Sequence, residues 1–76
     1  MPVVTVQVPA GSLEPAQKSQ LIARVTDVIV EVEGYEAIRP VTYVLVEEVP
    51  DGGFGLGGQP VDVPALKARL AAAQSR

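Results

Sequence analysis

The sequence lacks cysteine and histidine altogether, and it contains few aromatic or basic residues. Without cysteine no disulfide can form, and without either residue a transition-metal site loses its usual ligands. Aromatic residues make up 4% of the chain, and six basic residues face nine acidic ones, for a net charge of −3. This balance argues against a nucleic-acid partner, because binding to phosphate backbones depends on clustered lysine and arginine.

Long apolar runs are also missing from the sequence. No stretch approaches the roughly 20 apolar residues that are needed to span a bilayer. The amino terminus shows neither the basic segment nor the apolar core of a secretion signal. These absences predict a cytoplasmic protein with no membrane partner and no metal.

A chain of 76 residues predicts a single domain over residues 1–76. A domain of this size buries only roughly 60% of its unfolded surface and is marginally stable alone. Small domains are usually reinforced by disulfides, metals or oligomerisation. Because the composition argues against the first two, we expect the chain to form an oligomer.

Residues 2–8 predict a β-strand with a proline at its start. One face would carry Val4, Val6 and Val8, and the other would carry Val3, Thr5 and Gln7. Pro2 is small, so removal of Met1 is expected to leave it as the amino-terminal residue. Its nitrogen would then be a secondary amine, a candidate general base or nucleophile, whereas a retained Met1 would make it an amide. The alternative is a proline that only blunts the start of the strand.

An amphipathic helix is predicted from about residue 13 or 14 to Gly34. Ser12 is the expected N-cap, and Pro15 suits the first turn because its missing N–H would be unpaired there anyway. Gly34 can adopt the left-handed conformation that ends many helices. The expected apolar stripe consists of Leu21, Ile22, Val25, Val28, Ile29 and Val32.

After a connection at residues 35–40, residues 41–48 predict a second strand with apolar groups on both faces. Strand, helix and strand in this order predict a β-α-β unit with parallel strands. One helix covers only one face of such a sheet, so the second face and the edges require other subunits.

The remaining segments predict a small β-hairpin and a short C-terminal helix. Residues 50–53 are a turn, and the glycine-rich residues 54–61 favour a hairpin, because a phosphate-binding loop would need a Gly-Lys-Ser/Thr ending. Asp62 could cap a helix over residues 65–74, with Leu66 and Leu70 as its apolar anchors. The expected fold class is therefore α/β (α+β).

Taken together, these segments resemble the tautomerase superfamily, in particular its short 4-oxalocrotonate tautomerase branch. Pro2 begins the first strand, Gly11 closes the next turn, and Gln17-Lys18 stands early in the helix. A valine-rich strand follows at residues 41–46. The Phe-Gly-Leu-Gly-Gly of residues 54–58 is similar to the Phe-Gly-Ile-Gly-Gly of that branch.

The resemblance implies an isomerase that uses the amino-terminal proline as its acid–base, without a cofactor, on a small-molecule substrate. Pro2 would be the catalytic residue, since an α-amino group has a pKa of about 7.7–8.0 and desolvation lowers it. The resemblance also implies a homo-oligomer, expected as a hexamer, with a dimer or trimer as alternatives.

Two positions depart from the pattern of the best-known relatives. Ser12 follows the turn glycine, and Tyr43 lies eleven residues before Phe54, where those relatives carry arginines that bind a dicarboxylate. Neither side chain can pair with a carboxylate as a guanidinium does, although a hydroxyl can donate to a carbonyl or enol oxygen. Ser12, Arg39, Tyr43 and Phe54 are therefore the expected substrate-binding residues, and the expected substrate is an enolisable carbonyl acid with one carboxylate or none.

Other functions remain open at this stage. Relatives with hydratase, decarboxylase or dehalogenase activity also resemble this chain, and Glu47 or Glu48 would then be the candidate water-activating carboxylate. The chain could also be a non-catalytic oligomer subunit that lacks the two arginines.

Overall fold

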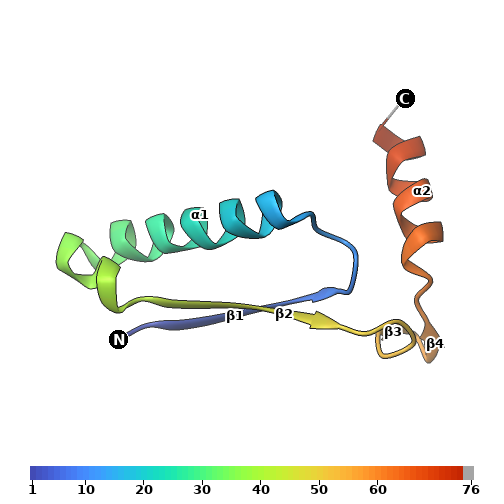
Figure 1. Cartoon of the computed structure of the whole chain (residues 1–76), viewed down its shortest axis with the longest axis horizontal. Coiled ribbons are helices and arrows are strands. Elements are labelled where there is room, and N and C mark those ends of the chain that lie inside the picture. The colour runs from blue at the N-terminus through green and yellow to red at the C-terminus, as the bar shows by residue number, and fades with distance from the viewer. Residues whose placement is uncertain (75–76) are drawn as a thin grey trace.

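The computed structural model describes residues 1–74 and contains a two-stranded parallel sheet, a long helix, a hairpin and a final helix (Figure 1). In chain order the elements are β1 (Val3–Pro9), α1 (Pro15–Glu33), the 3₁₀ helix η1 (Glu36–Val41), β2 (Tyr43–Val49), β3 (Gly55–Leu56), β4 (Gln59–Pro60) and α2 (Val63–Gln74). Among these residues, no helix is long and apolar enough to cross a membrane.

Strands β1 and β2 pair in parallel, with Val3 opposite Tyr43 and Pro9 opposite Val49. This pairing confirms the predicted β-α-β unit, and the antiparallel pair β3–β4 confirms the hairpin. The second strand starts two residues later than expected, because η1 occupies the end of the connection. The Thr42 N–H closes η1 by donating to the Arg39 carbonyl oxygen at 3.2 Å.

Helix α1 lies along one face of the sheet, and no helix or strand of the described residues covers the opposite face (Figure 1). Burial alternates along both strands as a single covered face requires. The half-buried residues on the helix side are Val4, Val6, Val8, Val44 and Val46. Val3, Thr5, Tyr43 and Leu45 on the other side are exposed. We call this second surface the open sheet face.

The first turn of α1 is capped by Glu14, so the prediction that Ser12 is the N-cap is wrong. The Glu14 N–H donates to Gln17 Oε1 at 2.8 Å, which is one half of a capping box. Pro15 occupies the first turn as predicted. Gly34 ends the helix with φ 83°, and its N–H donates to the Val30 carbonyl oxygen at 2.9 Å.

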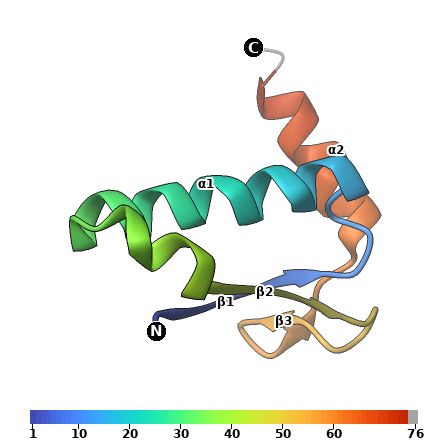
Figure 2. The same cartoon turned by 60° about the vertical axis from the view of Figure 1, so that its left-hand side comes forward.

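The apolar stripe of α1 was only partly predicted. Val28 and Val32 are 57% and 81% exposed, whereas Val30, outside the predicted stripe, is buried. Burial differs from the prediction because η1 packs against α1, so that the buried side of the helix includes the side that contacts η1 (Figure 2). The pair between Arg39 and Asp27 fixes this contact from the solvent side.

Helix α2 stands away from the sheet in both views (Figures 1 and 2). Val63 at its start is buried and Leu66 is half-buried, but Leu70 is 60% exposed, so its role as an anchor is wrong in the isolated chain. The side chain of Lys67 ties the helix to the turn after β1, because its Nζ donates to the Gly11 carbonyl oxygen at 2.9 Å.

The chain is far less compact than a typical folded monomer. Its radius of gyration is 15.5 Å, whereas about 11 Å is expected for this length. Its accessible surface is 5740 Å², against about 4,500 Å² for a compact monomer of this mass. Much of the excess surface is apolar, on the open sheet face, the outer side of α1 and the hairpin.

We predict that Gly34→Ala lowers the free energy of unfolding by about 1 kcal/mol, because a Cβ is disfavoured at positive φ. Gly34→Asn should cost less, since asparagine tolerates the left-handed conformation better. Chemical denaturation at one fixed protein concentration measures both. Equal losses for the two variants would contradict this explanation.

Candidate active site

Pro2 lies half-buried immediately before β1, beside the start of β2. The Tyr43 N–H donates to the Pro2 carbonyl oxygen at 2.9 Å, and Tyr43 is itself 52% exposed. This hydrogen bond fixes the backbone on which the Pro2 ring is mounted. Met1 is 77% exposed and packs on little, so its removal would expose the Pro2 nitrogen with little loss of burial.

Arg39 belongs to η1, which leads into β2 at the end of the sheet where Val3 lies opposite Tyr43, close to Pro2. Figure 2 shows the N-terminus at this end of the sheet. Its Nε donates to Glu36 at 2.6 Å and its Nη1 to Asp27 at 2.7 Å. The hydrogen bond to Glu36, followed by that to Asp27, raises the pKa of Arg39 above its usual range. The guanidinium is therefore firmly charged, but two carboxylates already occupy its donors.

Ser12 lies at the opposite end of β1, in the turn closed by its N–H and the Pro9 carbonyl oxygen at 3.1 Å. Seven residues of strand separate this turn from Pro2, a length of about 23 Å. The Ser12 Oγ is buried and has no hydrogen-bond partner among the described residues. It would have to turn outward to reach a substrate.

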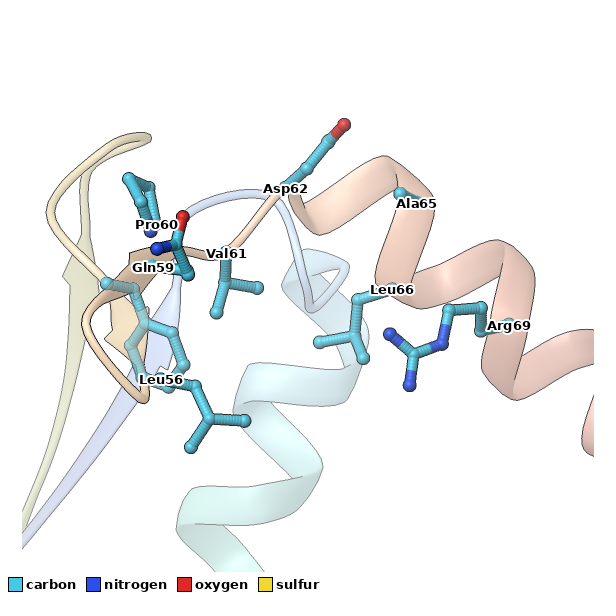
Figure 3. Close-up of a pocket in the computed structure, with 9 residues that line it drawn as sticks. Leu56, Gln59, Pro60, Val61, Asp62, Ala65, Leu66 and Arg69 are labelled. Atoms are coloured by element: carbon cyan, nitrogen blue, oxygen red, sulfur yellow. The ribbon is translucent and has the colours of Figure 1, made fainter.

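Phe54 lies between β2 and the hairpin, immediately before β3. The hairpin follows the carboxyl end of β2 (Figure 1). The Val61 N–H donates to the Phe54 carbonyl oxygen at 2.7 Å, while Gly57 and Gly58 turn the hairpin with positive φ. Phe54, 36% exposed, lines a cavity of about 330 Å³ between the hairpin and α2 (Figure 3).

The predicted site residues thus fall into two groups within one chain. Pro2, Tyr43 and Arg39 lie at one end of the sheet, whereas Ser12 and Phe54 follow the other ends of the strands. Only an assembly that joins opposite ends of different copies can bring all five together.

The two candidate carboxylates of β2 also lie away from Pro2 in the same chain. Glu47 accepts a hydrogen bond from Gln7 Nε2 at 3.1 Å, and Glu48 pairs with Lys18 at 2.9 Å. They stand opposite Gln7 and Val8, toward the far end of β1. No cluster of three or more potential metal-binding side chains occurs within residues 1–74.

Arg69 is a candidate functional residue that the sequence reading missed. It lines the same cavity as Phe54, one helical turn after Leu66. The signal available in the sequence was its i, i+3 spacing from an apolar residue of the final helix, which places both side chains on one face. The spacing alone could not predict a site, because the cavity forms only where the hairpin packs opposite this face of the helix.

Comparison with known proteins assigns the chain to a family. A family model described as tautomerase enzyme matches residues 2–63, and the chain belongs to this family. It is 34% identical over 61 residues to the "Probable tautomerase K2" of Dickeya dadantii (strain 3937), covering 80% of this chain and 88% of that protein.

Two solved structures are similar to this chain. The crystal structure of apo unfused 4-OT superimposes with a TM-score of 0.70 and 32% identity, over 79% of this chain and 93% of that one. The crystal structure of DmpI from Helicobacter pylori superimposes with a TM-score of 0.66 and 31% identity, over 79% of this chain and 95% of that one. The chain is an isomerase, a 4-oxalocrotonate tautomerase-like member of its family.

We predict that the pair between Glu48 and Lys18 stabilises the fold in a pH-dependent way. The hydrogen bond and charge of Lys18, with help from the Gly11 backbone, lower the pKa of Glu48 below its ordinary value of 4.5. A lowered pKa adds stability that is present above the ordinary value and is lost as the pH falls through the folded value. The stability difference between wild type and Glu48→Gln should therefore be constant at neutral pH and shrink below about pH 4.5.

Denaturation series from pH 7 to pH 3 test this, with Lys18→Gln as the control background. In that background the difference should lose its pH dependence, since the partner that lowers the pKa is gone. A difference that stays constant down to pH 3 in the wild-type background would show that the pair contributes nothing.

Proposed function

We propose that the chain, after removal of Met1, isomerises a small enolisable carbonyl acid with the Pro2 nitrogen as acid–base. The observation that carries this proposal is the placement of Pro2. It is held at the end of a paired strand, beside the exposed Tyr43, and the family match begins at this residue.

The chemistry requires one group that removes a proton from the substrate and returns it to another atom. In a keto–enol or dienol–enone isomerisation, the base takes a proton from the enol oxygen and delivers it to carbon, or the reverse. Nothing else is gained or lost, so no cofactor is needed. A secondary amine serves well, because partial desolvation brings its pKa from about 7.7–8.0 toward neutrality.

Substrate contacts come from both groups of residues. Tyr43 is exposed beside Pro2, and its hydroxyl can donate to a carbonyl or enol oxygen. Arg39 would bind a carboxylate only by releasing Asp27 or Glu36. Phe54 would form an apolar wall from a neighbouring copy. Ser12 would contribute from a neighbouring copy, with its hydroxyl rotated out of the interior.

This proposal includes a homo-oligomer, with a hexamer as the expected form and a dimer or trimer as the alternatives. The open sheet face leaves Val3 and Leu45 65% and 43% exposed, and the outer side of α1 leaves Val32 81% exposed. A second copy that covers these side chains would remove a large apolar area from water. Assembly would also complete the active site.

We predict that Pro2→Ala lowers the isomerase rate by about 10²–10⁴-fold, the usual contribution of positioned acid–base catalysis. Alanine leaves a terminal amine, but a primary amine that no ring holds in one direction. The strand does not need the proline for pairing, because only its carbonyl oxygen is hydrogen-bonded to Tyr43. The measurement compares rates on a phenylpyruvate-like acid, with circular dichroism to confirm the fold.

The control is wild-type protein in which Met1 is retained, verified by intact mass. An amide nitrogen is not basic, so this form should be at least as impaired as the alanine variant. Near-wild-type rates in both forms would show that Pro2 is not the acid–base.

We predict that Leu45→Lys weakens self-association by at least about tenfold, because it places an unpaired charge on the open sheet face. Ala37→Lys, at an exposed position of η1 outside the open sheet face and α1, is the matched control and should leave association unchanged. Sedimentation over a micromolar concentration series measures both. A wild-type chain that is a folded monomer throughout this range would refute the assembly.

A further inference from the structure

The cavity between the hairpin and α2 is built mainly from apolar side chains. Leu56, Val61 and Leu66 face a common space, and the guanidinium of Arg69 lies at its edge (Figure 3). Its volume of about 330 Å³ lies at the lower end of the range for small-molecule sites. Leu56 is 78% exposed, so this apolar surface is uncovered in the isolated chain.

Arg69 differs from most other basic residues of the described chain in having no partner. Lys18 pairs with Glu48, Arg39 with Asp27 and Glu36, and Lys67 with a backbone oxygen. Within residues 1–74, no ion pair or side-chain hydrogen bond involves Arg69 or Arg24. Of these two, only Arg69 lines a cavity.

The acidic residue that lines this cavity, Asp62, does not pair with the Arg69 guanidinium. Asp62 lies on the rim, but its carboxyl group points away from Leu66 and Arg69 (Figure 3). An anion bound at Arg69 would therefore meet a cation that no carboxylate within residues 1–74 neutralises. Arg69 is exposed, but the apolar side chains of Val61 and Leu66 beside it would shield a bound anion from part of the surrounding water and so strengthen the charge–charge attraction.

We propose that Arg69 is the carboxylate-binding residue of this enzyme and that the cavity accepts the apolar body of a monocarboxylate. This inference rests on the proposed function, in which Phe54 is a wall of the active site, because Phe54 and Arg69 line one cavity. Pro2 lies at the opposite end of the sheet in the same chain. For both to act on one substrate, the cavity of one copy would therefore have to lie beside Pro2 of another copy.

The placement of this cation explains how the enzyme handles an acid without arginine at Ser12 or Tyr43. Arg69 belongs to α2, which lies almost wholly beyond the family match at residues 2–63. A single guanidinium in an apolar cavity favours one carboxylate on an apolar body over a dicarboxylate, whose second charge would lie against Leu56 or Leu66 without a partner.

Binding of phenylacetate, which has no carbonyl to isomerise, tests the cavity independently of catalysis. Titration calorimetry of the Met1-processed oligomer should show binding, and Arg69→Gln should weaken it by about 10- to 100-fold, the range for a charge-assisted hydrogen bond. Arg69→Lys should restore part of this loss. Arg24→Gln is the matched control, because it removes one exposed arginine outside the cavity and should leave affinity unchanged. Phenylacetamide, which is neutral, should bind weakly and equally to all variants.

The kinetic arm compares a phenylpyruvate-like acid with its methyl ester. Arg69→Gln should raise KM for the acid by a similar factor with kcat nearly unchanged, and it should leave the ester unaffected. If phenylacetate binding depends on Arg69 but no isomerisation occurs, the cavity assignment stands and the proposed function fails. If Arg69→Gln and Arg24→Gln alter phenylacetate affinity equally, or phenylacetate does not bind because a second copy fills the cavity, the assignment of Arg69 is overturned.

Discussion

The structure depends on one packing constraint: a single helix can cover only one face of a two-stranded sheet. Helix α1 covers the face that carries Val4, Val6, Val44 and Val46, and nothing within residues 1–74 covers Val3 or Leu45. Among the described residues only Val30 and Val63 are buried, so no substantial core exists within one copy. In the proposed oligomer, most of the hydrophobic area that stabilises the fold would therefore be buried between copies.

The same constraint governs the active site. Parallel strands place Pro2 and Tyr43 at one end of the sheet and send the chain to the hairpin from the other end. A short β-α-β unit has no further element that could fold back over Pro2. In the proposed assembly, residues that approach the proline from outside its own strand pair and η1 would come from another copy. Association that buries the open sheet face would then also complete the proposed site.

Local patterns in the sequence predicted the elements well, because each rests on short-range physics. The alternation of residues 2–8, the stop at Gly34 and the glycines of residues 54–58 correctly gave a strand, a helix end and a hairpin. The errors arose where a distant contact decided the outcome. Contact with η1 turned the covered side of α1 toward Val30 and left Val28 and Val32 exposed. Periodicity alone could not show this, because it describes one helix and not the packing of the 3₁₀ segment against that helix.

For the site, the sequence alone was enough to propose Pro2, because after removal of Met1 its nitrogen would be a secondary amine at a strand end; this role stays a prediction. The sequence could not show which arginine is available to bind a substrate carboxylate, because this depends on whether acidic side chains already pair with it in the fold. Arg39 stood close to Tyr43 along the chain, yet Asp27, twelve residues earlier, and Glu36 hold it. Arg69 lies on α2, and the hairpin that turns at Gly57 and Gly58 forms a cavity with that helix; within residues 1–74 no carboxylate pairs with Arg69. Arg39 must break its hydrogen bonds to Asp27 or Glu36 before it can bind a substrate carboxylate. Arg69 would lose only bound water. This difference favours the arginine of the final helix over the one near the proline.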